Sequence, residues 1–147
     1  MEIKKCIDFA NKIKICFVAT CDGEQPRVRP LLMWFADETG FYFQTQTVKN
    51  FYKQLLKSPK IELCFWDPDE GKTLRVTGEV EFLEDFELKK RCLKERPFLY
   101  EIGIRDEKDP ILALFRVSQG EAFFWTRADS MKEDQIQKIK FELTKQT

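Results

Sequence analysis

The chain has 147 residues, 43% of them hydrophobic, and its 25 basic and 25 acidic side chains cancel at neutral pH. This length predicts one domain over residues 1–147, in which folding buries about two-thirds of the surface that the unfolded chain exposes. Zero net charge provides no overall field toward nucleic acid or an anionic membrane, so any anion site must be local.

The N-terminal third predicts a helix followed by a hairpin. Residues 2–12 are amphipathic, with Ile3, Cys6 and Ile7 among the residues on one face. They lack the long apolar run of a signal peptide or membrane span, so we expect a soluble cytoplasmic protein without membrane attachment. Residues 14–22 and 27–40 then predict a β-hairpin around the turn at 22–26, with Pro30 marking an edge or bulge.

The rest of the chain predicts five more strands and three more helices. The expected strands are 40–45, 61–66, 73–84, 111–117 and 121–126, the last two joined by a hairpin at 118–120. The expected helices are one that begins near Thr47 and stops at Pro59, one over 86–97 capped by Asp85, and a terminal one that begins with a Ser130–Glu133 capping box and carries Ile136, Ile139 and Leu143. Residues 98–109 are charged and irregular. Seven strands with few helices between them favour an antiparallel barrel.

The chain contains no histidine and five cysteines, with no CxxC pair. Without imidazole it lacks the commonest general base and the best zinc ligand, so we assign no metal site and no catalytic side chain. Cysteines within apolar segments are typical of buried thiols in a reducing compartment. An enzyme of this composition would take its reactivity from a cofactor, or from carboxylates, cysteine or lysine.

Polar residues gather where the third strand passes into the second helix. Thr45, Thr47, Lys49 and Asn50 fall within six positions, which is more than a helix cap needs. The first turn of a helix presents free backbone N–H groups and about half a positive charge, so hydroxyls and a lysine there suit a phosphate. The alternative is that Thr47 is an N-cap, Lys49 a solvated lysine and Thr45 an ordinary strand residue.

Arg27 and Arg29 lie two positions apart in an extended segment, so they project from the same face. Guanidinium groups match phosphate through bidentate hydrogen bonds, and neighbouring strands could bring this pair to the junction near Lys49. The alternative is an exposed sheet face on which the arginines pair with Glu62 or Glu79.

Five linked segments resemble the pyridoxamine 5'-phosphate oxidase-like, FMN-binding split-barrel family, nearest to its small prokaryotic members: 26-PRVRP-30, 41-FYFQT-45, 49-KNFYKQL-55, 58-SPKIELCFW-66 and 75-RVTGEVEFLED-85. The likeness covers most of the chain. It implies an α+β fold built on an antiparallel split β-barrel of six or seven strands with short flanking helices. It also implies a homodimer with FMN at the subunit interface.

The resemblance implies that the strand from Arg27 to Leu31 runs along the flavin, that Lys49 binds its phosphate and that Thr73 lies near its ring. With the anion site, the candidate cofactor-binding residues are Arg27, Val28, Arg29, Pro30, Leu31, Gln44, Thr45, Thr47, Lys49, Asn50 and Thr73. The true oxidases recognise their substrate with a C-terminal arginine and histidine, and this chain has no histidine. Oxidation of pyridoxamine phosphate is therefore not expected.

The leading functional hypothesis is an FMN-dependent oxidoreductase that takes hydride from a reduced nicotinamide and reduces a small acceptor, such as a quinone, a nitro compound or free flavin. The sequence does not separate this from a non-catalytic flavin-binding or flavin-sensing dimer. A deazaflavin or haem would suit the same fold, haem less well without a histidine ligand. A different class is an all-β interaction module without cofactor, for which zero net charge and missing base-stacking motifs disfavour nucleic acid.

Overall fold

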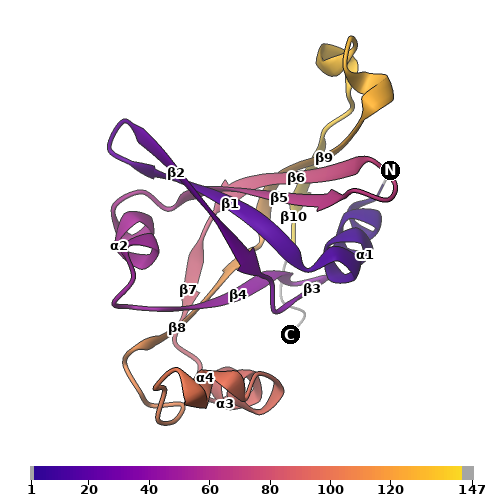
Figure 1. The fold of residues 1–147 in the computed structure, drawn as a ribbon. Helices are drawn as coiled ribbons and strands as arrows, with labels where there is room; N and C mark the ends of the chain where they lie inside the picture. The colour runs from indigo at the N-terminus through magenta and orange to yellow at the C-terminus, as the bar shows by residue number, and fades with distance from the viewer. Residues whose placement is uncertain (1, 144–147) are drawn as a thin grey trace.

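The computed structural model describes residues 2–143, which form two antiparallel β-sheets with helices around them (Figure 1). The helices are α1 (Ile3–Ile13), α2 (Asn50–Lys57), α3 (Phe86–Glu95) and α4 (Phe98–Glu101), with 3-10 turns η1 (Arg127–Asp129) and η2 (Glu133–Gln135). The strands are β1 (Ile15–Asp22), β2 (Gln25–Leu32), β3 (Phe35–Asp37), β4 (Gly40–Gln46), β5 (Lys60–Asp67), β6 (Lys72–Glu79), β7 (Glu81–Leu83), β8 (Leu112–Val117), β9 (Gln119–Thr126) and β10 (Ile139–Glu142). No helix within residues 2–143 is both long and apolar enough to span a membrane.

One sheet has six strands in the order β10-β9-β6-β5-β1-β2, and the other has four in the order β3-β4-β8-β7. All pairings between strands are antiparallel. This arrangement confirms the predicted β-rich split-barrel fold with short flanking helices. The expected seven strands were too few, and the described residues do not close into one continuous barrel, because the chain is divided between two sheets. The second hairpin arm, expected over 27–40, was too long: β2 ends at Leu32, and Phe35–Asp37 form β3 of the other sheet.

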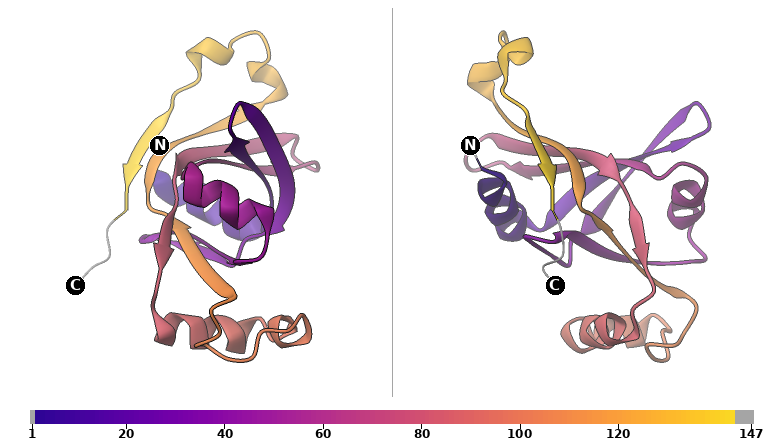
Figure 2. Two further views of the ribbon diagram at one scale, coloured as in Figure 1. Left: turned by 90° about the vertical axis from the view of Figure 1, so that its left-hand side faces the viewer. Right: turned by 180° about the vertical axis from the view of Figure 1, so that it is seen from behind.

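The main core lies between the two sheets and beneath α1 and α2. It is formed by apolar side chains on the inner face of the six-stranded sheet, such as Val18, Leu63 and Val76, together with Phe43 and Phe115 of the four-stranded sheet. A second cluster packs α3 and α4 against the other face of the four-stranded sheet, which sets these helices apart as a separate layer (Figure 2). Neighbouring residues of a strand face opposite sides of its sheet, so only every second residue points into the core. This explains why apolar residues alternate along the strands.

The chain passes between the two sheets four times, and two of these crossings, after β6 and after β8, are adjacent in space. The segment 73–84, expected as one strand, divides at Val80 into β6 of the large sheet and β7 of the small one. The expected hairpin at 118–120 was also wrong: β8 pairs with β4 and β7, whereas β9 pairs with β6 and β10. A Cβ on Gly120 would lie 1.8 Å from the carbonyl oxygen of Thr77, so only glycine permits this close approach of β9 to β6.

Two predicted helices and one segment expected to be irregular need comment. Asp85 caps α3 as expected, its carboxylate accepting hydrogen bonds from the backbone N–H groups of Glu87 and Leu88. Helix α2 begins at Asn50 and not near Thr47, because β4 continues to Gln46, which pairs with Leu112 of β8. Residues 98–109, expected to be irregular, include α4.

The expected terminal helix does not form over the part of it that the structure describes. Residues 139–142 form β10 on the open edge of β9. Ile139 and Phe141 alternate along this strand and pack against the main core, which is a period of two where a helical period was inferred. The capping box that does form joins Thr126 to Asp129 and begins η1.

Candidate functional site

A cleft of about 620 Å³ lies between the β1–β2 hairpin and α2. We call it the basic cleft, and its lining residues are Asp22, Arg27, Val28, Arg29, Asn50, Lys53, Gln54 and Lys57. Four cationic side chains and one carboxylate leave an excess of three positive charges. Because the whole chain is neutral, this excess is a local property of the cleft.

Arg29 forms the rigid floor of the basic cleft. Its guanidinium donates hydrogen bonds to the carbonyl oxygen of Val18 at 3.1 Å, to Thr20 Oγ1 at 2.8 Å and to Gln54 Oε1 at 2.7 Å. It also lies 4.7 Å from the centroid of the Phe51 ring. Burial lowers the pKa of Arg29, and the nearby Arg27 charge acts in the same direction. These contacts join β1, β2 and α2, so Arg29 fixes the shape of the cleft.

Arg27 is held much more loosely. Its Nε lies 3.3 Å from Asp22 Oδ2, and both side chains are about half exposed. An ion pair this exposed contributes little to stability. The Arg27 guanidinium can therefore turn to an incoming anion at small cost.

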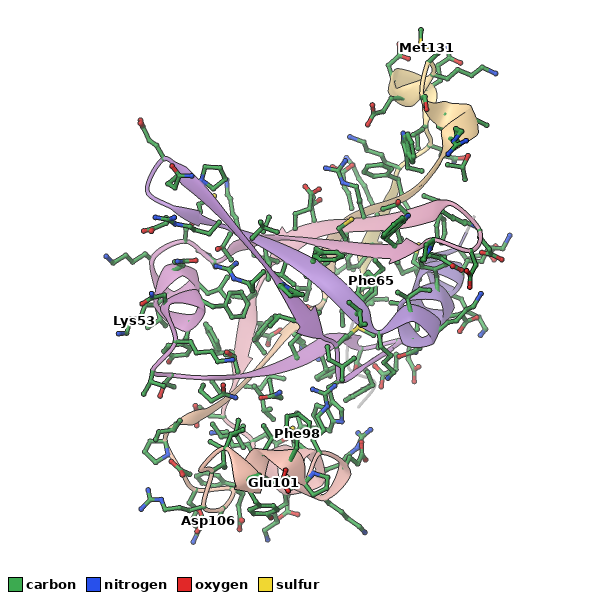
Figure 3. The ribbon with its side chains drawn as sticks, viewed as in Figure 1. Lys53, Phe65, Phe98, Glu101, Asp106 and Met131 are labelled. Carbon is green, nitrogen blue, oxygen red and sulfur yellow. The ribbon has the colours of Figure 1, made fainter. Side chains whose placement is uncertain are left out.

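The lysines of the cleft come from α2. Asn50, Lys53 and Lys57 recur at intervals of three and four and so share one helical face, while Phe51 and Leu55 are buried on another. Lys53 projects outward from the helix (Figure 3). Sequence reasoning missed Lys53, Gln54 and Lys57; the signal was their shared face with Asn50.

The structure brings together four of the residues predicted from sequence: Arg27, Val28, Arg29 and Asn50. Arg27 and Arg29 share a face as expected, being paired with Thr20 and Val18 of β1, but Asp22, Thr20 and Gln54 contact them in place of Glu62 or Glu79.

The other predicted residues lie outside the lining of the basic cleft. Pro30 and Leu31 continue β2, and Lys49 is the exposed N-cap residue of α2. Thr47 donates from its backbone N–H to the carbonyl oxygen of Ile111 at 2.9 Å.

Gln44 and Thr45 lie in β4, where Gln44 Oε1 accepts a hydrogen bond from Gln46 Nε2 at 3.1 Å. Thr45 is buried, and its hydroxyl has no hydrogen-bond partner among residues 2–143. Thr73 of β6 lines a different depression, together with Arg75, Trp125 and Glu133.

Comparisons with known proteins agree with this fold. A sequence profile described as pyridoxamine 5'-phosphate oxidase matches residues 3–126. A NimC/NimA family protein from Clostridium acetobutylicum aligns at 26% identity and a TM-score of 0.77, covering 95% of this chain and 93% of that one. A protein from the same organism related to general stress protein 26, of the pyridoxinephosphate oxidase family, aligns at 20% identity and a TM-score of 0.67, covering 96% and 94%.

PhzG from Burkholderia lata, solved in complex with tetrahydrophenazine-1-carboxylic acid, aligns at 12% identity and a TM-score of 0.69, covering 95% of this chain and 90% of that one. No curated protein matches the chain. The profile match extends over most of the sequence, and members of its family generally bind flavin or related ligands. The chain therefore belongs to the pyridoxamine 5'-phosphate oxidase family.

Proposed function

We propose that this chain is an FMN-binding oxidoreductase that works as a homodimer, takes hydride from a reduced nicotinamide and reduces a small acceptor. The observation that carries the proposal is the excess of three positive charges in the basic cleft, beside an ordered helix. A phosphate monoester is a dianion whose oxygens accept several charge-assisted hydrogen bonds. The family membership and the cleft thus support the same class of ligand.

The residues present fit the phosphate of FMN. Arg27 offers a guanidinium held only by an exposed ion pair, and Lys53 and Lys57 offer ammonium groups from one helical face. Asn50 adds an amide donor at the start of α2, while Arg29 of the hairpin is joined to α2 by its hydrogen bond to Gln54. The contacts expected at Pro30, Leu31, Gln44, Thr45, Thr47, Lys49 and Thr73 stay predictions.

Bound flavin supplies the electron transfer, since its ring accepts and donates hydride. The protein's own part is to bind and orient. With no histidine in the chain, the side chains that line the basic cleft contribute charge and hydrogen bonds, and the only carboxylate among them is Asp22. Asp22 forms an exposed ion pair with Arg27, which an incoming anion can replace at small cost.

An apolar surface supports the proposed homodimer. Ile15, Phe17, Val28 and Leu32 of β1 and β2 are between 42% and 69% exposed. The strand register, which pairs Ile15 with Leu32, places all four on the outer face of the six-stranded sheet. Grouped apolar side chains of this size are typical of a surface that a second copy covers.

The five cysteines are all unpaired, and Cys6, Cys16 and Cys92 are buried. Burial raises the pKa of the Cys6 thiol to about 11 and that of Cys92 to about 12, which keeps these thiols protonated and unreactive. Free thiols support our proposal of a cytoplasmic location.

Binding of FMN by variants tests the proposed site. We expect Arg27→Ala and Lys53→Ala each to weaken FMN by about 1–3 kcal/mol, because each removes a charge-assisted hydrogen bond. Quenching of flavin fluorescence measures the dissociation constants. Lys140→Ala, which removes an exposed lysine of β10 outside the cleft, is the control and should bind FMN normally.

Lys49→Ala tests whether the phosphate binds beside the N-cap residue of α2 and not in the basic cleft. Weaker binding in Lys49→Ala alone would move the phosphate to the start of the helix, and unchanged binding in Arg27→Ala and Lys53→Ala would remove the basic cleft from the proposal.

Sedimentation velocity should show a dimer for every variant. An anaerobic spectrum then tests catalysis: the absorbance near about 450 nm should bleach on addition of a reduced nicotinamide, whereas a non-catalytic flavoprotein would keep it.

A further inference from the structure

One amide side chain in the lining of the basic cleft is held in a fixed position. Gln54 of α2 accepts two hydrogen bonds at the same oxygen, Oε1: one from Thr20 Oγ1 at 2.6 Å and one from Arg29 Nη2 at 2.7 Å. Arg29 Nη1 in turn donates to Thr20 Oγ1 at 2.8 Å, which closes a ring of three side chains from β1, β2 and α2. The Gln54 amide is therefore ordered before any ligand binds.

The ring also decides which end of the amide faces it. A guanidinium group only donates hydrogen bonds, so Arg29 requires an acceptor on Gln54. If the amide were turned over, its Nε2 donors would lie against the donors of Arg29. Oε1 therefore faces Arg29 and Thr20, and Nε2, which makes no hydrogen bond to another of residues 2–143, keeps its N–H groups for a ligand.

This amide donor belongs to a cleft in which donors predominate. The only carboxylate of the lining, Asp22, lies 3.3 Å from Arg27 Nε and is already paired with it. A lysine must lose side-chain freedom when it binds a ligand, whereas the Gln54 amide is already ordered by its two hydrogen bonds. Gln54 thus adds a donor of defined direction to the positive charge of the cleft.

The side chains of the cleft leave the range from pH 5 to pH 7.5 free for the ligand to titrate. Histidine is the side chain whose ordinary pKa lies in this range, and the chain contains none. The charged residues that line the cleft are Asp22 of β1, Arg27 and Arg29 of β2, and Lys53 and Lys57 of α2. A phosphate monoester, in contrast, takes up a proton with a pKa of about 6. A change in anion binding over this range therefore reports the proton on the ligand.

We propose that Gln54 is a specificity residue of the basic cleft: its Nε2 donates to an oxygen of a doubly ionised tetrahedral anion, and the cleft discriminates against the singly protonated phosphate. This proposal rests on the proposed function in one respect, the use of the same cleft. The protonated phosphate has one negative charge fewer to balance the excess of three positive charges. It also brings a donor of its own to a group of donors, so one of its oxygens becomes a poorer acceptor.

Two small anions test this preference by calorimetric titration of the purified protein at pH 5 and pH 7.5. For a second pKa of about 6, methyl phosphate is about one-tenth dianion at pH 5 and almost entirely dianion at pH 7.5, so its binding should weaken about tenfold at the lower pH. Sulfate is a dianion at both values, so its binding should change by less than about twofold. Equal binding of methyl phosphate at the two pH values, or no binding of either anion at pH 7.5, would overturn the proposal.

Gln54→Glu separates the donor from the part that Gln54 plays in the fold. Glutamate keeps an oxygen for Thr20 and Arg29 but replaces the amide donor with a second carboxylate oxygen. The variant should therefore fold, as thermal melting followed by circular dichroism will show, and should bind both anions more than about tenfold less tightly at pH 7.5. Gln135→Glu, the same change at an exposed residue of η2 outside the cleft, is the matched control and should bind them as the parent protein does.

Unchanged binding of both anions in a folded Gln54→Glu protein would overturn the role of Gln54. Titration with FMN separates this proposal from the proposed function. If the parent protein binds methyl phosphate with the expected pH dependence but does not bind FMN, the proposed function is wrong and the specificity of the cleft holds. If the parent protein and Gln54→Glu bind FMN equally tightly, the role of Gln54 is wrong and the cofactor site stands.

Discussion

The basic cleft and the outer face of β6 and β9 differ in charge, in position and in construction. The cleft is built from residues 22–57 on the side of the sheet that faces α2, whereas the outer face of β6 and β9 is bordered by residues 127–138, between β9 and β10. Arg29 joins the cleft together by hydrogen bonds to β1 and α2, while residues 127–138 project from the fold (Figure 1). A chain with zero net charge can thus carry an excess of three positive charges in one cleft.

We expect the largest loss of stability from a substitution at the close contact between β6 and β9, away from the basic cleft. Gly120→Ala would place a Cβ 1.8 Å from the carbonyl oxygen of Thr77, forcing β9 away from β6. We expect a loss of roughly 3 kcal/mol in the free energy of unfolding, measured by urea denaturation. The folded fraction should still bind FMN, because the basic cleft lies on other strands.

Gly23→Ala is the control for backbone conformation. Gly23 also has a positive φ, 61°, but a Cβ there would meet no atom within 4 Å, so we expect a loss of only about 1 kcal/mol. Equal destabilisation by the two substitutions would show that the contact between β6 and β9 is not tight.

The two arginines of β2 should differ in the same assay. Arg29→Met removes hydrogen bonds to Val18, Thr20 and Gln54 in a partly buried site, and we expect a loss of about 1.5–3 kcal/mol of stability. Arg27→Met should lose less than about 1 kcal/mol, because the ion pair with Asp22 is exposed. If Arg29→Met were as stable as Arg27→Met, Arg29 would not be the floor of the cleft.

The smallest effect concerns pH. Hydrogen bonds from the backbone N–H groups of Ile111 and Arg105, and from the Arg105 side chain, lower the pKa of Asp109 from 3.8 to about 2. The ionised carboxylate is the form that stabilises the fold, so its contribution is complete above the ordinary pKa and is lost as pH falls toward 2. It orders the loop whose Pro110 and Ile111 carbonyls bind Thr47, next to α2.

Asp109→Asn should therefore melt below the parent protein at pH 7, and the difference should shrink as pH falls from about 4 to 2. Thermal melts followed by circular dichroism at several pH values measure it. A difference that stays constant with pH would mean that the charge of Asp109 is not what matters.

Local patterns predicted the early part of the chain well. The turn at 22–26, the hairpin around it and the shared face of Arg27 and Arg29 depend on alternation and turn chemistry within a short window. The cap at Asp85 was predictable for the same reason. The basic cleft was predictable only in part. Lys53 and Lys57 have the sequence pattern of a solvated helix face, and the sequence does not show that α2 lies beside β2.

The later part depends on pairing between distant segments. Ile136, Ile139 and Leu143 fit a helical spacing, yet the open edge of β9 gives residues 139–142 a partner and makes Phe141 the matching core residue. Likewise, 118–120 has the composition of a hairpin turn, but the available partner of β9 is β6. Tertiary contacts decided both cases, and they are not encoded in a local window.

The paired crossings at Val80 and at residue 118 have a further consequence for how the chain can be divided. Each sheet is assembled from pieces that alternate along the chain with pieces of the other, so neither sheet corresponds to a continuous stretch of sequence. A cut at Val80 divides the strands of both sheets between the two fragments. We therefore expect fragments cut between β6 and β7 to remain unfolded alone and to regain structure only when mixed.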